Sequence, residues 1–570
     1  MSFATFSTFT ELPYERPNLE SYRTDLEAIK QRLTSATHPN DCLEAVADWN
    51  QLRIDVSTMH SLAEVRYTQN VKDPVWKAEK EFFDVESPNI QDWNNQVEQL
   101  LVSSAHRAAI EEKYGSLFLT RMEQALRVFA PEIKSIMVEE ARLCEEYNNI
   151  TASARIELNG TTYNLSTIGK LAIDLDRDVR RQAVQAQYAF LGEHAQRIDE
   201  IYHELVQLRT SKARALGFAN YVDFRYVEFG RVDYGAAEVA SFRQSVIDHV
   251  VPLVSRLKQA QAKRLGRDTL ALYDEKLMFA DGNPIAEGER TFIVDAATTM
   301  YRELSPETAE FFQLMLDGDL MDLDARDNKA TGGYCTSFPS YGVPFIFANF
   351  NKTTHDVEVL THEAGHAFQA YRSRTQPVLE YHWPTAEACE IHSMGMEFLT
   401  WPWMDLFFGA NTDKFKFYHL AGALIFLPYG CAVDHFQQWV YEHPEVTPAE
   451  RNSRWKELEA LYMPWRDTSD VPVASEGRQW QFQRHIIESP FYYIDYALAQ
   501  TCALQYWQKS LADRKTAFDD YLRICDLGGS KPFLGIVEAG GLTSPFHPTC
   551  LESVVQTAYQ WLGTHYPNYI

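Results

Sequence analysis

Apolar residues that recur with the period of an α-helix constrain the fold of this chain more than any other feature. Most segments longer than a dozen residues show this period, and the clearest are 19–33, 74–83, 110–129 and 175–192. Asp176 and Asp178 open the last of these segments with negative charge, which the positive end of a helix dipole favours. Thr447 and Glu450 have the spacing of a capping box, with Pro448 in the first helical turn. The sequence therefore predicts a mainly α-helical protein.

The chain is too long for one simple hydrophobic core. It has 570 residues, whereas single cores stop growing near ~250–300 residues. We therefore expect two lobes, with an N-terminal helical lobe over residues 1–200 and a second domain over residues 201–570. The polar stretch 264–283 and the Gly/Asp-rich stretch 317–333 are candidate linkers.

Two short segments read as β-strands. Residues 155–165 alternate around Asn159-Gly160, and an Asn-Gly pair between alternating strands is the strongest short hairpin signal. Residues 342–350 are apolar and β-prone, and they end just before the motif described below. Pro344 cannot donate a hydrogen bond within a sheet, so this second segment is predicted to be an edge strand.

Charge and cysteine content narrow the class of protein. The formal net charge of −26 argues against a nucleic-acid partner, because phosphate binding requires clustered Lys and Arg. The eight Cys form no C-x-x-C pair and are too sparse for a disulfide framework.

The first residues lack the basic and apolar regions of a secretory signal. The most apolar stretch, 420–433, is interrupted by Pro and Gly and is shorter than a membrane span. We expect a soluble protein of the cytoplasm, without a membrane partner.

The motif H-E-x-x-H at residues 362–366 is the most specific chemical signal. Residues four apart share one face of a helix, so His362 and His366 can both reach one ion, and imidazole suits zinc. Glu363 lies one residue round the helix, where it can act on a water molecule. Chance predicts only roughly 0.04 such matches in a chain of this composition. Flanking apolar residues indicate a buried helix, and Thr353 with Asp356 resembles its N-terminal cap.

A catalytic zinc ion usually has three protein ligands. The carboxylates downstream of the motif are Glu380, Glu387, Glu390 and Glu397. Spacing alone does not select among them. His392 and Cys389 point away from the acidic face of the same predicted helix, so neither is expected to bind the metal.

The chain resembles the thimet oligopeptidase/oligoendopeptidase F family of zinc peptidases, and most closely its oligoendopeptidase F, or Pz-peptidase-like, branch. The resemblance rests on D-V-x-x-L-x-H-E-x-G-H-A at residues 356–367 and E-I-H-S-M-G-M-E at residues 390–397. It implies that Glu390 is the third ligand and that Glu397 hydrogen-bonds a ligand. It extends loosely from about residue 152 to the C-terminus.

The resemblance also implies the rest of the site. Tyr493 and Tyr496 correspond to the family's tyrosine pair that stabilises the tetrahedral intermediate, and His485 to the histidine upstream of them. All three are expected on one tyrosine-rich helix, for which an aromatic core helix is the alternative. The segment 342–350 would pair with the backbone of an extended peptide. Gly332-Gly333-Tyr334 resembles the family's glycine-containing loop near the cleft, or is an ordinary turn.

The resemblance implies a two-lobed, zincin-type helical peptidase with a deep substrate channel and a small β element near the zinc helix. Residues 201–570 would then be the catalytic domain, with one Zn²⁺ per chain on His362, His366 and Glu390. We expect an endopeptidase in which Glu363 is the base acting on water, and short unstructured peptides as substrates. The alternatives are an exopeptidase of the dipeptidyl carboxypeptidase kind and a peptide-binding protein without turnover. Glu363 argues against the last, since binding needs no base.

Overall fold

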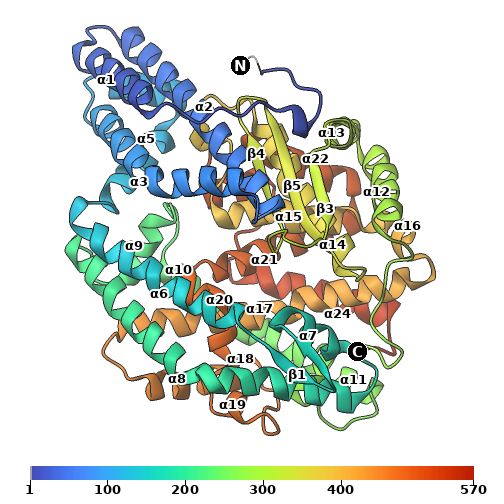
Figure 1. The fold of residues 1–570 in the computed structure, drawn as a ribbon. Coiled ribbons are helices and arrows are strands. Elements are labelled where there is room, and N and C mark those ends of the chain that lie inside the picture. The colour runs from blue at the N-terminus through green and yellow to red at the C-terminus, as the bar shows by residue number, and fades with distance from the viewer. Residues whose placement is uncertain (1–2) are drawn as a thin grey trace. The chain divides into compact units, whose positions relative to one another are not determined.

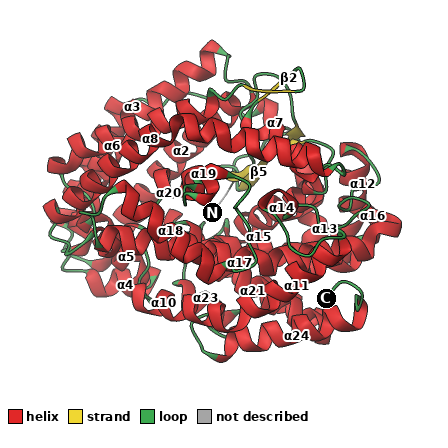
Figure 2. Ribbon diagram, turned by 90° about the horizontal axis from the view of Figure 1, so that it is seen from below, coloured by secondary structure: helices red, strands yellow, loops and turns green. Residues whose placement is uncertain are grey.

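The computed structural model describes residues 3–570, and helices make up most of it (Figure 2). This confirms the mainly α-helical prediction. The chain divides into two compact units. Unit 1 comprises Met1–Arg127, Ile285–Thr412 and Lys509–Leu542, and unit 2 comprises Val128–Pro284, Asp413–Gln508 and Thr543–Ile570. The boundary expected at residue 200 falls inside a single helix, α8 (Arg177–Ala215). Each unit consists of three separate segments of the chain, so no single boundary divides the sequence into the two units.

Unit 1 consists of helices and one small sheet. Its helices are α1 (Leu19–Ser35), α2 (Pro39–Gln69), α3 (Pro74–Val102), α4 (Arg107–Tyr114), α5 (Ser116–Arg127), α12 (Arg290–Leu304), α13 (Pro306–Asp317), α14 (His355–Ser373), α15 (Ala386–Leu399), α16 (Asp405–Phe408), α22 (Arg514–Leu527) and α23 (Phe533–Ala539). Helices α1 to α5 enclose a core around Trp49 and Phe118. The expected helix 110–129 is two helices, because Gly115 breaks it with a φ of 86°.

Unit 2 is built around the long helix α8. The elements that lie wholly or mostly in it are α6 (Lys134–Ala152), β1 (Ile156–Leu158), β2 (Thr161–Tyr163), α7 (Leu165–Gly169), α8, α9 (Tyr221–Glu228), α10 (Ala236–Ser245), α11 (Val251–Arg264), α17 (Thr412–Glu442), α18 (Pro448–Tyr462), α19 (Pro472–Ser475), α20 (Arg484–Glu488), α21 (Tyr493–Ala512) and α24 (Thr549–His565). Asp176 caps α8 by accepting the N–H of Asp178. The predicted capping box of Thr447 and Glu450 is present at the start of α18.

The predicted hairpin is confirmed. Strands β1 and β2 pair antiparallel, with Leu158 opposite Thr161. Asn159 and Gly160 form the two-residue turn and both have positive φ, at 52° and 78°. That pair of angles is what the tight hairpin turns with a right-handed strand twist require.

The sheet in unit 1 contains β3 (Met321–Asp324), β5 (Val343–Phe350) and β4 (Tyr334–Phe338), in that order across the sheet (Figure 1). The prediction that β5 is an edge strand is wrong, since β5 is central. Pro344 is tolerated because it lies opposite Ser337 of β4, while the pairing of β5 with β3 begins only at Ile346. The antiparallel strand β4 is therefore the edge on one side.

One helical run, Asp405–Glu442, is long and apolar enough by composition to cross a membrane, with a mean hydropathy of 1.2 over its most apolar window. Within the described residues, 72% of that window is buried inside the protein. Core helices of soluble proteins pass the same test, so the run is weak support for a membrane span.

Candidate metal centre

The H-E-x-x-H motif lies on α14, which packs against β4 and β5 of the small sheet (Figure 1). The apolar residues that flank the motif, among them Leu360 and Ala367, are buried and anchor the helix. The rings of His362 and His366 lie one turn apart, with 5.0 Å between their centroids. Both imidazoles can therefore be directed at one point, as the spacing predicted.

The start of α14 differs from the predicted cap. The helix begins at His355, and Thr353 instead donates its hydroxyl hydrogen to the Asn351 side chain. The carboxylate of Asp356 accepts the backbone N–H groups of Asn351 at 2.9 Å and Lys352 at 2.7 Å. Asp356 thus fixes the turn between β5 and α14 and places a negative charge at the helix N-terminus.

Helix α15 approaches α14 unusually closely at Gly365. A Cβ atom at this position would lie 2.5 Å from the carbonyl oxygen of His392 and 2.7 Å from Cα of Ser393. Any larger residue would push the helices apart. The approach brings Glu390 of α15 opposite the two histidines of α14.

The ligand atoms of His362, His366 and Glu390 all lie within 4.8 Å of one another. Glu390 Oε2 is 3.3 Å from Nε2 of His362 and 3.5 Å from Nε2 of His366. Two imidazoles and one carboxylate are the protein ligands of one common class of catalytic zinc site. The geometry and the donor chemistry of this group therefore fit a zinc ion.

The other residues considered from the sequence lie outside this group. His392 is buried, and its Nδ1 is 2.7 Å from the carbonyl oxygen of Ala388. Glu380 accepts hydrogen bonds from the guanidinium of Arg53. Among the described residues, neither Glu387 nor Cys389 belongs to the candidate metal-binding group of His362, His366 and Glu390. The structure thus places Glu390 beside the two histidines, a choice that sequence spacing left open.

Two polar side chains orient the candidate ligands. Nδ1 of His362 is 2.7 Å from Oε1 of Glu397, so a carboxylate fixes the ring and favours the tautomer that leaves Nε2 for a metal. The hydroxyl of Ser393 donates to Oε2 of Glu390 at 3.0 Å. Glu397 therefore lies where the resemblance implied.

Burial and charge shift the titration of the site. Burial, the largest effect on Glu363, raises the pKa of its carboxyl above the ordinary value. Burial alone would lower the pKa of His362, but its contacts with Glu390 and Glu397 outweigh burial and raise it well above the ordinary value. Burial opposes ionisation of Glu390, yet the two imidazoles outweigh it and lower the pKa of Glu390. Glu363 is thus tuned towards accepting a proton, and Glu390 stays ionised.

The segment before β4 lies beside Glu363. A Cβ atom on Gly333 would be 3.5 Å from Oε1 of Glu363 and 3.4 Å from the carbonyl oxygen of Phe347. The predicted glycine-containing loop is therefore next to the candidate base.

The tyrosines and His485 gather in unit 2, but not on one helix as predicted. Helix α20 ends at Glu488 and α21 begins at Tyr493, because Pro490 interrupts the helical hydrogen bonds and Phe491 adopts a φ of 65°. The rings still form one cluster. The centroid of His485 lies 5.0 Å from that of Tyr493 and 5.9 Å from that of Tyr496. Tyr492 completes the cluster, 5.1 Å from Tyr496.

Three arginines of unit 2 hold the turn that carries this cluster. Arg209 donates to the carbonyl oxygen of Ile487 at 2.5 Å, and Arg225 to that of Pro490 at 3.0 Å. Arg231 donates to the carbonyl oxygen of Phe491 at 2.6 Å. It also donates to the buried carboxylate of Asp495, again at 2.6 Å. Charge-assisted hydrogen bonds of this kind stabilise a turn that contains an unfavourable φ.

Sequence reasoning missed the roles of Gly365 and the arginines. A glycine inside a buried helical pattern is itself a signal of close packing, so Gly365 could have been identified. The arginines lie 260 to 278 residues before their partners in the turn, and nothing local marks them.

Comparison with known proteins agrees with the helical fold. The model of the Peptidase M3 N-terminal domain matches residues 9–129, and that of Peptidase family M3 matches residues 171–282 and 309–555. A structure of Pz peptidase A with an inhibitor is 44% identical, with a TM-score of 0.93, over 99% of this chain and 100% of that one. A structure from Bacillus anthracis strain Ames, assigned to oligoendopeptidase F, is 41% identical over the whole of both chains, with a TM-score of 0.89.

A curated relative, the Group B oligopeptidase PepB of Streptococcus agalactiae, is 20% identical over 348 residues, which are 60% of this chain and 54% of that protein. The chain spans about half the length of the curated relatives it matches. The helical fold, the His-His-Glu group and the family match together define a member of a peptidase family. The chain belongs to peptidase family M3.

Proposed function

We propose that this protein is a zinc-dependent endopeptidase, or oligopeptidase, that hydrolyses short unstructured peptides. The observation that supports this most is the convergence of His362, His366 and Glu390 within 4.8 Å, with Glu363 on the same helix. The related structures, that of Pz peptidase A and that of the Bacillus anthracis protein assigned to oligoendopeptidase F, support the class of oligopeptidases.

His362, His366 and Glu390 would hold one Zn²⁺ per chain. When bound, zinc supplies a Lewis acid that polarises a peptide carbonyl and acidifies water. Glu397 keeps the His362 ring oriented, and Ser393 does the same for the Glu390 carboxylate.

Glu363 is the proposed general base and acid. Its raised pKa makes the carboxylate a better proton acceptor near neutral pH than an exposed glutamate. It takes one proton from the attacking water and delivers it to the amide nitrogen, which leaves as the new amino terminus. As charge develops on the carbonyl oxygen, we propose that Tyr493 or Tyr496 donates a hydrogen bond to it, assisted by His485.

The edge strand β4 is the proposed binding surface for the peptide backbone. An extended peptide can pair with the free edge of an antiparallel sheet through main-chain hydrogen bonds, independently of its side chains. This replaces the role first expected for β5, whose two sides are occupied by β3 and β4. Backbone pairing favours flexible substrates of varied sequence.

Zinc analysis combined with three variants tests the metal and the base. Glu363→Gln should retain about one zinc per chain and lose ~10²–10⁴-fold in kcat. Glu390→Gln should lose zinc affinity, whereas its matched control Glu387→Gln, one turn earlier on α15, should not. The reverse result for these last two variants would mean that the ligand assignment is wrong.

The mode of cleavage requires product masses. Incubation with a ten-residue peptide should give internal fragments, and a folded protein such as native albumin should remain intact. Stepwise release of dipeptides from the C-terminus would instead establish the exopeptidase alternative. Binding without any cleavage would establish the peptide-binding alternative.

We also propose a cytoplasmic location without nucleic-acid or membrane partners. The net charge of −26 and eight cysteines that are all free in the structure support this proposal. Fractionation of the producing cells would test it.

A further inference from the structure

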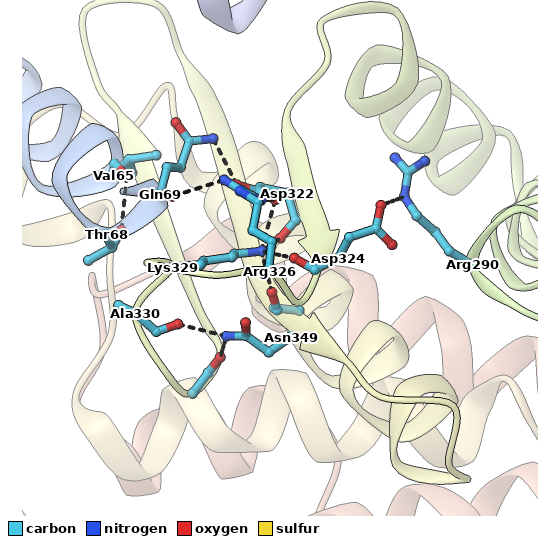
Figure 3. Close-up of polar contacts among 12 residues, drawn as sticks. Val65, Thr68, Gln69, Arg290, Asp322, Asp324, Arg326, Lys329, Ala330 and Asn349 are labelled. Atoms are coloured by element: carbon cyan, nitrogen blue, oxygen red, sulfur yellow. Dashed lines mark hydrogen bonds and ion pairs between the residues drawn. The ribbon is translucent and has the colours of Figure 1, made fainter. Parts of the chain in front are cut away.

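Lys329 lies in the Gly/Asp-rich stretch that the sequence suggested as a linker, between β3 and β4 (Figure 3). Its side chain is fully buried. Nζ contacts three backbone carbonyl oxygens, those of Asp322 at 3.0 Å, Asp324 at 2.9 Å and Ala348 at 2.6 Å. It also contacts Oδ1 of Asp322 at 2.8 Å. The stretch is therefore not a free linker but is anchored to β3 and β5.

The charge of Lys329 is compensated locally. A buried ammonium is costly unless it is paired and hydrogen-bonded. The Asp322 carboxylate supplies the opposite charge, and is itself fixed by two hydrogen bonds from Arg326 and one from Gln69 (Figure 3). The ring of Phe347 lies 4.4 Å from Nζ and adds a cation–π contact. The hydrogen bonds from the Lys329 ammonium to these carbonyl oxygens therefore hold the connection between β3 and β4 against β5.

The residues that follow Lys329 are held as well. The Asn349 side chain of β5 donates to the carbonyl oxygens of Ala330 at 2.9 Å and Gly332 at 2.8 Å. The backbone N–H of Ala330 donates to the carbonyl oxygen of Thr68, at the end of α2, at 2.8 Å. The path of the chain from Lys329 to Gly332 is thus determined by side chains and by neighbouring backbone.

This path ends at two features of the candidate active site. Gly333 follows directly and lies against Oε1 of Glu363. Tyr334 then begins the edge strand β4, stacked on Phe347 with 4.9 Å between ring centroids. A displacement of Lys329 would therefore reach both the base and the strand proposed to bind the substrate.

We propose that Lys329 is a positioning residue for peptide hydrolysis. Its buried ammonium fixes residues 330–334, so that the Gly333 backbone lies beside Glu363 and the free edge of β4 keeps its register. The inference rests on the proposed function, because it assigns Lys329 a part in that reaction. Lys329 acts only through these residues and touches neither the candidate ligands nor the substrate.

Chemical rescue of Lys329→Ala tests the proposal. Misplacement of catalytic groups by about 1 Å costs ~10²-fold in rate, so kcat/KM of the zinc-loaded variant should fall by that order. The truncation removes three carbons and the ammonium nitrogen, which are the heavy atoms of n-propylammonium. Added n-propylammonium should therefore restore activity better than ethylammonium or guanidinium. Zinc affinity should match the wild type. Arg290→Gln is the matched control, because Arg290 pairs with Asp324 at the exposed surface, where such pairs contribute little.

A second variant and a second readout cover poor folding and a purely structural role. Asn349→Ala removes two hydrogen bonds to the same segment and should lower kcat/KM about tenfold. Amide hydrogen exchange over residues 330–338 should accelerate in Lys329→Ala and slow again with n-propylammonium, whether or not peptides are cleaved. Unchanged exchange in this segment, or wild-type kcat/KM in the zinc-loaded variants, would overturn the inference. A wild-type protein that cleaves no peptide would overturn the proposed function itself, and with it the catalytic role of Lys329.

Discussion

Substitution of Gly365 by alanine should weaken zinc binding, although Gly365 is not itself a candidate ligand. The added Cβ would lie 2.5 Å from the carbonyl oxygen of His392 and 2.7 Å from Cα of Ser393, both backbone atoms of α15. Ordinary contact begins near 3.4 Å, so the two helices must separate locally by roughly 0.9 Å. Neither neighbour can move aside as a flexible side chain would.

That separation exceeds what a metal site tolerates. Ligand distances in zinc sites hold within about ±0.2 Å, and Glu390 lies on the displaced helix, opposite His362 and His366. We expect zinc affinity to fall ~10–100-fold, the range seen when the supports of ligands are removed. Overpacking of this kind should also lower the free energy of unfolding by ~1–3 kcal/mol.

Zinc affinity is measured by competition with a chelator of known affinity, and stability by urea unfolding of the metal-free protein. Gly422→Ala is the matched control, since Gly422 is also helical but a Cβ there meets nothing within 4 Å. That variant should gain ~0.5–1 kcal/mol from the better helix propensity of alanine. If Gly365→Ala binds zinc as tightly as the wild type, the close approach of α14 and α15 does not set the ligand geometry, and the argument fails.

Three further predictions concern the same chemistry. Glu397→Gln should weaken zinc binding ~10–100-fold in the chelator assay, because it removes the negative partner of His362. The raised pKa of His362 gives two opposite pH dependences above the ordinary histidine range: the stability of the metal-free protein should fall as pH rises through that pKa, whereas zinc affinity should rise, because zinc displaces the proton. Thermal unfolding with and without zinc measures both, and parallel trends would contradict the assignment. Tyr493→Phe or Tyr496→Phe should lower kcat ~10²–10³-fold with KM little changed, and full kcat in both variants would leave an aromatic core as the better interpretation.

Local patterns predicted much of the fold. The helical period, the capping box at Thr447 and the Asn159-Gly160 hairpin all describe interactions within a few residues, and each is present. Predictions failed where distant segments decide. Strand β5 reads as an edge strand because of Pro344, yet its neighbours β3 and β4 make it central. The stretch 317–333 reads as a linker, yet β5 anchors it at Lys329 and the end of α2 anchors it at Ala330.

The candidate site divides in the same way. Helix geometry places residues four apart on one face, so the sequence by itself determined the pair of His362 and His366 and the position of Glu363 beside them. Spacing could not choose Glu390 over its neighbouring carboxylates. That choice depends on the packing of α15 against α14 at Gly365, which is a long-range contact between helix faces. The family resemblance implied Glu390, but only the tertiary structure supplies the physical reason, because a local pattern specifies which face a side chain occupies and not what another segment brings against that face.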